Sequence, residues 1–174
     1  ILLLAPITQV QADHSASHRA NQVKAAITLN IVRFVSWPDG TFSDASESIH
    51  LCYYQHDPFD NSLLSIADKE VAGRPLVIRQ VNEPEQVAGC HVMLVYHRLV
   101  TEFNIEAKAN PGEELLTIAD YTYSTDQART GMVVALVQNN TRIGFVIDLR
   151  ESNRAGLKIS SRLLKHANVL GAGD

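Results

Sequence analysis

Hydrophobic residues recur along the first part of the chain with the period of a helix. Between about His18 and Val35 they fall every three or four positions, which predicts a helix with one apolar face. Trp37 and Pro38 follow, and a proline disfavours helical backbone at the residue before it, so the helix must end by this point. The apolar stripe of this helix consists of Val23, Ile27, Ile31 and Phe34.

Shorter apolar runs after Pro38 predict strands that alternate with helices. The run from His91 to Tyr96 is the most continuous, which is typical of a strand in the middle of a sheet that is covered on both faces. The other predicted strands are Ser48 to Tyr54, Leu76 to Val81, Glu114 to Ile118, Met132 to Val137 and Arg142 to Leu149. The predicted helices are Pro58 to Ala67, Thr101 to Ala109, a short one that ends near Gly156, and a last one capped by Ser160 or Ser161.

The order of these elements predicts an α/β fold. We expect a single three-layer domain with a largely parallel sheet and flanking helices, because strands alternate with helices along the chain. The last two strands flank Asn139-Asn140 and predict a C-terminal antiparallel hairpin. The expected strand order places the first strand beside the third, as in flavodoxin-like sheets. We assign residues 13–174 to this domain, since the chain of 174 residues suffices for one ordinary core.

Residues 1–12 have the character of a secretory leader. Ile1 to Ala5 is apolar, and Val10-Gln-Ala12 fits the pattern of small residues that precedes a cleavage site. We therefore interpret residues 1–12 as the remnant of a signal peptide, which is too short to span a bilayer. The alternative is a hydrophobic N-terminus that packs on the domain. The first interpretation predicts an exported protein.

The two cysteines agree with export. Cys52 lies in the first predicted strand, and Cys90 lies at the entrance to the third. In an oxidising compartment an even number of cysteines favours a disulfide, and the expected strand order would bring these two close together. The alternative is a pair of separate buried thiols.

The composition and motifs indicate neither a nucleic-acid partner nor an enzyme. The formal net charge is -4, and the C-terminal cations from Arg150 to Lys165 are typical of the solvated face of terminal helices. No Gly-rich phosphate loop follows the first strand, and no Gly-x-Ser-x-Gly elbow is present. The histidines lack zinc-ligand spacing. We therefore predict no catalytic residue, no cofactor and no metal.

The carboxyl ends of the strands are the expected binding site for a small ligand. His56 and Asp57 follow the first strand, and Tyr96 and His97 follow the third. Ligands of open α/β sheets favour this edge. The alternative for Asp57 is that it caps the helix that begins near Pro58. This crevice supplies a second functional hypothesis, a small-molecule binding or sensor domain.

Several segments together resemble the YfiR family. Residues 23–38, which read VKAAITLNIVRFVSWP, are similar to the opening signature of that family, and residues 142–164 are similar to its closing signature. Asp57-Pro58-Phe59 and Gly89-Cys90-His91 also fit the pattern. One departure is Thr28, which stands where the family has an aromatic residue.

The resemblance implies a periplasmic repressor of a membrane-bound diguanylate cyclase, YfiN. In that system the repressor binds the periplasmic domain of the inner-membrane cyclase and lowers cyclic-di-GMP, a signal for biofilm formation. An outer-membrane lipoprotein, YfiB, can sequester the repressor. The resemblance also implies a homodimer and a disulfide that matches Cys52–Cys90, for which redox control is a further hypothesis. We therefore predict a periplasmic regulatory protein that binds these partners and no nucleic acid.

Overall fold

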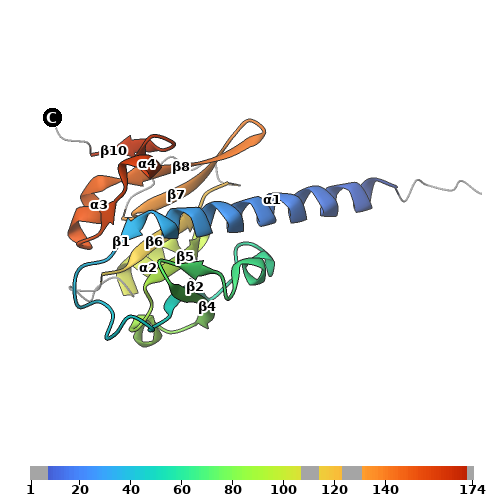
Figure 1. Ribbon diagram of the computed structural model, residues 1–174. Helices are drawn as coiled ribbons and strands as arrows, with labels where there is room; N and C mark the ends of the chain where they lie inside the picture. The colour runs from blue at the N-terminus through green and yellow to red at the C-terminus, as the bar shows by residue number, and fades with distance from the viewer. Residues whose placement is uncertain (1–7, 107–113, 123–130, 172–174) are drawn as a thin grey trace, which may run out of the picture.

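The chain folds into a twisted sheet with a long helix packed across it (Figure 1). The computed structural model describes residues 8–106, 114–122 and 131–171. In this part of the chain, eight strands form the main sheet, and the predicted α/β class is confirmed. Their spatial order is β10 (Asn168–Leu170), β8 (Arg142–Asp148), β7 (Val134–Asn139), β6 (Leu116–Asp120), β5 (Val92–Tyr96), β2 (Ile49–Tyr54), β4 (Arg74–Val81) and β3 (Glu70–Val71).

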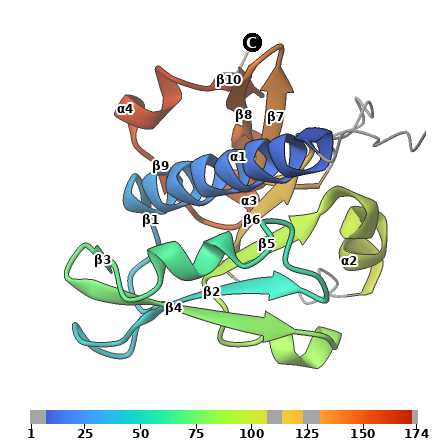
Figure 2. The same ribbon diagram turned by 90° about the vertical axis from the view of Figure 1, so that its right-hand side faces the viewer.

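The strand order agrees with the flavodoxin-like expectation. β2, the first predicted strand, lies between β4 and β5 and is parallel to both. The pairings of β5 with β6, β6 with β7 and β8 with β10 are also parallel, whereas β3 pairs antiparallel with β4. β7 and β8 form the predicted antiparallel hairpin, and Asn140 in its turn has a φ of 55°, in the left-handed region that asparagine tolerates. Figure 2 shows the twist of the sheet, with β4 lying across the view and β7 standing nearly upright.

Four short strands were not predicted. β3 and β10 extend the two edges of the main sheet, and β1 (Val35–Ser36) pairs antiparallel with β9 (Lys158–Ile159). β1, β3 and β9 contain two residues each, which is too short to produce a recognisable period. The pairing of β1 with β9 joins the end of the first helix to the C-terminal part of the chain.

The helices differ from the prediction mainly in length and type. The first helix, α1 (Thr8–Arg33), begins inside the segment interpreted as a leader, so that interpretation stays a prediction. α3 (Leu149–Arg154) is followed by Gly156 at a φ of 68°, as predicted. Ser160 caps α4 (Ser161–Leu164), which has only four residues. The other helical segments are α2 (Val100–Glu106) and the 3-10 helices η1 (Ser62–Ile66), η2 (Pro84–Val87) and η3 (His97–Leu99).

The predicted α-helix from Pro58 to Ala67 is wrong. The structure has a turn followed by η1, because Asp60 and Asn61 take φ values of 49° and 64° that a right-handed helix does not allow. The predicted helix from Thr101 is confirmed as α2, although its expected residues 107–109 lie outside the described residues.

Apolar side chains pack on both faces of the sheet. In β5, Leu94 belongs to the core beneath α1 and η1, whereas Met93 and Val95 belong to a second core that includes Phe103 of α2. Successive side chains of a strand point to opposite faces, so the two cores lie on opposite sides of the sheet. The first four residues of β5 are buried, which confirms the prediction of a central strand.

A buried ion pair fixes α1 to the sheet. The Nζ atom of Lys24 lies 2.8 Å from Oδ2 of Asp120, with side-chain exposures of 0% and 1%. Lys24 also donates to the carbonyl of Pro58 at 3.4 Å, and its ammonium lies 4.9 Å from the centre of the Phe59 ring. The other oxygen of Asp120 accepts from the backbone N–H and the hydroxyl of Thr122. Such satisfied partners offset the cost of removing both charges from water.

Removal of either charge should destabilise the fold strongly. We expect Lys24→Met or Asp120→Leu to lower the free energy of unfolding by about 3–5 kcal/mol, because each leaves one unpaired charge in the core. The double variant should be more stable than either single variant, because no buried charge remains. Denaturant unfolding of the three variants measures this effect.

The matched control is Arg154→Met, which removes a cation that is 73% exposed and paired with Glu151. This control should change the free energy of unfolding by less than about 1 kcal/mol, as is usual for surface pairs. A similarly small effect of Lys24→Met would contradict the assigned role of the buried pair.

Candidate functional site

An apolar groove lies between α1 and the C-terminal segment, above β8. Its volume is about 500 Å³. The groove lies on the same face of the sheet as α1, because Phe145 of β8 packs against the core beneath that helix. The lining residues are Ile27, Asn30, Ile31 and Phe34 of α1, Phe145 of β8, Arg162 and Leu163 of α4, and Lys165 and His166 after it.

The predicted apolar stripe of α1 forms one wall of the groove. Its residues do not all enter the core: Ile31 is fully buried, Ile27 and Phe34 are half-buried, and Val23 is 49% exposed. The opposite wall is held by α4, whose N-cap Ser160 accepts a hydrogen bond from the backbone of Arg162. Ser160 also donates its own backbone N–H to the carbonyl of Phe34 at 2.9 Å. The groove is therefore built by segments that are joined through backbone hydrogen bonds.

The rim of the groove is positively charged. Arg162 and Lys165 are exposed there, His166 lies beside them, and among the residues that the structure describes no acidic side chain lines the groove. This local charge contrasts with the formal net charge of -4 for the whole chain. Half-buried apolar side chains surrounded by cations favour an occupant with an apolar surface and acidic groups. From the sequence we interpreted these cations as part of the solvated face of terminal helices, and we did not predict the groove.

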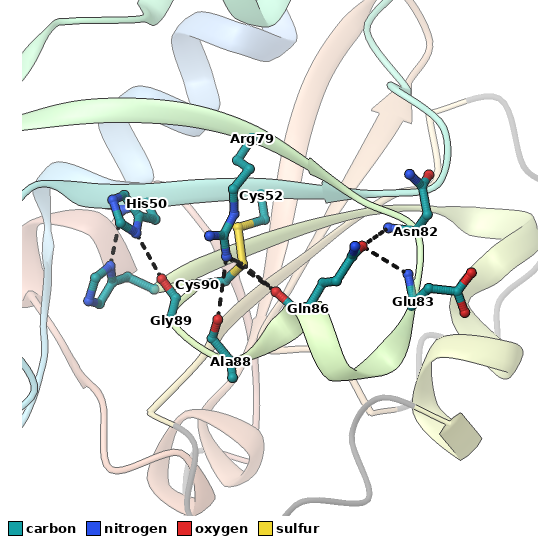
Figure 3. The surroundings of a disulfide bond; sticks show 10 residues. His50, Cys52, Arg79, Asn82, Glu83, Gln86, Ala88, Gly89 and Cys90 are labelled. Carbon is teal, nitrogen blue, oxygen red and sulfur yellow. Dashed lines mark hydrogen bonds between the residues drawn. A yellow bond between two sulfur atoms is a disulfide. The ribbon is translucent and has the colours of Figure 1, made fainter.

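The predicted disulfide between Cys52 and Cys90 is confirmed (Figure 3). The Cα atoms of the two residues are 6.0 Å apart, because β2 lies beside β5 and Cys90 lies two residues before the start of that strand. Arg79 of β4 donates to the carbonyls of Gln86 and Ala88, and its Nη2 lies 3.2 Å from Sγ of Cys90. The disulfide and Arg79 together connect three neighbouring strands through the loop that carries Cys90.

The structure brings most of the predicted crevice residues together. The ring centres of His56 and Tyr96 are 5.8 Å apart, and those of Tyr96 and His97 are 4.5 Å apart. Tyr121, which the sequence analysis missed, lies 6.0 Å from His97. We refer to His56, Tyr96, His97 and Tyr121 as the aromatic row. The signal that could have identified Tyr121 is its position directly after β6, which corresponds to the positions of Tyr96 and His97 around the end of β5.

Asp57 is not part of the aromatic row, and its side chain instead forms hydrogen bonds with the backbone that follows it. Its two carboxylate oxygens accept the backbone N–H groups of Phe59 at 2.8 Å and Asn61 at 2.9 Å. This is the capping role that the sequence analysis kept as an alternative, although Asp57 caps a turn and not an α-helix. These hydrogen bonds give Asp57 a structural role at this position.

Two further properties of the described residues bear on the site. Within residues 8–106, 114–122 and 131–171, no three His, Cys, Asp or Glu side chains are grouped so that they could hold a metal ion. In the same ranges, no helix has both the length and the apolar character that are needed to cross a membrane.

The comparison with known families is consistent with the resemblance seen in the sequence. The sequence model of a family described as YfiR/HmsC-like matches residues 21–168. No curated protein is similar enough to the chain to count as a match. The matched range includes α1 from Asn21 onwards, both cysteines and all residues that line the groove.

Loss of the disulfide should destabilise the protein measurably. The bond closes a loop with a sequence separation of 38. In the chain-entropy description such a loop corresponds to about 4 kcal/mol, so Cys52→Ala with Cys90→Ala should lower the free energy of unfolding by about 2–4 kcal/mol. Denaturant unfolding of the oxidised protein and of the double variant measures the difference.

Chemical reduction of the unaltered protein provides the control for this experiment, because it opens the same loop and leaves both side chains in place. Reduction and the double variant should have similar effects. A loss of less than about 1 kcal/mol in both would contradict a stabilising role of the disulfide.

Proposed function

Because the chain belongs to the YfiR/HmsC-like family, we propose that it is a periplasmic regulator that binds and represses a membrane-bound diguanylate cyclase. Its partner is the periplasmic domain of an inner-membrane cyclase of the YfiN type. An outer-membrane lipoprotein of the YfiB type sequesters the regulator and releases synthesis of cyclic-di-GMP. The protein acts as a homodimer and is not itself an enzyme. The family membership and the apolar groove with its basic rim support this proposal.

The groove is the surface that we assign to the cyclase. Its half-buried residues Ile27, Phe34 and Phe145 remain partly in contact with water in the free protein. A partner that covers them gains the hydrophobic free energy of their burial. The cations Arg162 and Lys165 lie at the edge, where charged residues of an interface guide association and select the partner. The occupant is therefore a segment of the cyclase domain that carries apolar and acidic side chains.

Binding alone can account for repression. A membrane enzyme with active and inactive states is shifted toward the state that the regulator binds more tightly. A shift from about 99% active to about 99% inactive requires an affinity difference of about 10⁴-fold between the two states. No catalytic group in the regulator is needed for this effect. The groove meets the requirement if its shape fits the cyclase domain in only one state.

Charge reversal at the rim should weaken binding to the cyclase. We expect Arg162→Glu with Lys165→Glu to reduce the affinity for the isolated periplasmic domain of the cyclase by about tenfold or more, equivalent to about 1.4 kcal/mol. Both side chains are exposed, so the fold should remain intact. Surface plasmon resonance measures the affinity, and the cyclic-di-GMP level in cells should rise toward that of a deletion strain.

The matched control is Lys69→Glu, which reverses an exposed cation beside β3, away from the groove. This variant should bind the cyclase domain like the unaltered protein. Equal binding by the control and by the double variant at the rim would exclude the groove as the docking surface.

The aromatic row supports a second function, the binding of a small molecule. Three imidazole or phenol rings gather around the ends of β2 and β5, and Tyr121 continues the row after β6. This is the edge of an α/β sheet at which ligands bind. Aromatic and imidazole rings at such spacings can stack on a planar ligand, and an imidazolium can pair with its carboxylate. The ligand class is therefore a planar aromatic acid.

A thermal shift experiment tests the second function. We expect 4-hydroxybenzoate, as the probe, to raise the midpoint of thermal unfolding in a concentration-dependent way, because it binds only the folded state. Tyr96→Ala should abolish this rise, and the rim variant Arg162→Glu with Lys165→Glu should retain it. No rise, or an equal rise in Tyr96→Ala, would argue against a ligand site at the aromatic row.

A further inference from the structure

His91 connects three parts of the fold at the start of β5. Its backbone N–H donates to the carbonyl of His50 at 2.9 Å, and its carbonyl accepts from the backbone of Leu116 at 3.0 Å. The indole Nε1 of Trp37 donates to the same carbonyl at 3.3 Å. His91 therefore links β2, β6 and the segment that follows α1.

The ring of His91 forms a hydrogen bond that depends on its protonation state. Its Nδ1 accepts the backbone N–H of His50 at 3.0 Å, which requires an unprotonated Nδ1. The imidazole of the neighbouring His50 is held in place by a hydrogen bond between its Nδ1 and the carbonyl of Gly89, which are 2.9 Å apart. Because a carbonyl only accepts, Nδ1 of His50 carries a proton. Figure 3 shows His50 and Gly89 beside the disulfide of Cys52 and Cys90.

The surroundings of the His91 ring are closely packed and contain both signs of charge. The ring is buried and stacks on Phe42, with ring centres 4.5 Å apart. The guanidinium of Arg74 lies 4.0 Å from the centre of the same Phe42 ring. The titratable and charged groups that face His91 are Glu47 in the loop before β2, His50 of β2, Arg74 of β4 and Glu114 before β6.

These surroundings favour the neutral imidazole. Burial lowers the pKa of His91 from its ordinary value of 6.5, and the electrostatic effects of His50 and Arg74 lower it further. Glu47, whose Oε1 lies 3.9 Å from Nε2 of His91, and Glu114 act in the opposite direction but do not reverse the shift.

We propose that His91 is a proton-sensitive lock that holds Trp37, Phe42 and the start of β5 against β2 at neutral pH and releases them in mild acid. Protonation places an N–H on Nδ1 opposite the N–H of His50, so that one hydrogen bond is replaced by two facing donors. The same proton adds a positive charge to a buried ring near Arg74. Both effects favour outward movement of the ring, toward water and the carboxylate of Glu47.

The proposal rests on the geometry of this cluster and not on the function proposed above. No partner protein is needed for the lock to open, so its failure and that of the cyclase-binding proposal are distinguishable. The lock also lies next to the disulfide, because His91 directly follows Cys90 in the chain.

The direction of the pH effect follows from the lowered pKa. The stability that His91 contributes is complete above pH 6.5 and is lost as the pH falls through the lower pKa of the folded state. Between these two values the equilibrium constant for unfolding should rise by up to about tenfold for each pH unit, because the ring binds the proton after it leaves its buried position and not in the locked state.

His91→Asn tests the lock, because the Oδ1 atom of asparagine can accept the N–H of His50 but does not titrate. Denaturant unfolding from about pH 7.5 to about pH 5 should give the unaltered protein a pH dependence in the range where histidines titrate, and His91→Asn should lose most of it. The matched control is His18→Asn, which removes an exposed histidine of α1 and should retain the dependence. An equal pH dependence in the unaltered protein and in His91→Asn would overturn the proposal.

A second measurement keeps the proposal testable if His91→Asn does not fold. Hydrogen exchange of the unaltered protein, corrected for the intrinsic effect of pH, should show loss of protection at the amide of His50 in mild acid. The NMR signals of the His91 ring should show an unprotonated Nδ1 at neutral pH. A protonated Nδ1 at neutral pH, or unchanged protection in acid, would refute the lock.

Discussion

The position of α1 is the constraint on which the groove depends, and a buried ion pair sets it. Lys24 reaches Asp120 at the end of β6, so this part of α1 cannot slide along the sheet without separating two charges in the core. At the other end, Phe34 accepts the backbone N–H of Ser160, and β1 pairs with β9. The helix is thus fixed by charge near its middle and by backbone hydrogen bonds at its exit. The wall of the groove that α1 forms is therefore held in one position.

The sequence predicted the sheet well because burial on both faces leaves a local signal. The unbroken apolar run that forms β5 identified the central strand, and the strand order that follows from alternating elements brought Cys52 close to Cys90. The segment around Asp60 and Asn61 shows the limit of this signal. Its apolar spacing suits an α-helix, but the left-handed backbone of these two residues, which hydrophobicity does not report, ends any such helix.

The site was less predictable because its residues are defined by contacts between distant segments. Lys24 and Asp120 are separated by 96 positions, and the only local sign of their pairing is a lysine on the buried side of a helix. Likewise, Ile31 and Val23 belong to the same apolar stripe, yet one is fully buried and the other is 49% exposed. A pattern of apolar residues therefore identifies a face but cannot separate the part that forms the core from the part that stays exposed.

The groove and the histidine cluster are connected through a short piece of backbone. Phe34 lines the groove, and Trp37, three positions later, donates its indole N–H to the carbonyl of His91. Between them lies β1, whose pairing with β9 leads directly to Ser160 and α4, the other wall of the groove. A series of hydrogen bonds therefore leads from His91 through Trp37 and β1 to both walls of the groove. Because both walls share this backbone connection, the groove and the strand ends around His91 are parts of one hydrogen-bonded unit.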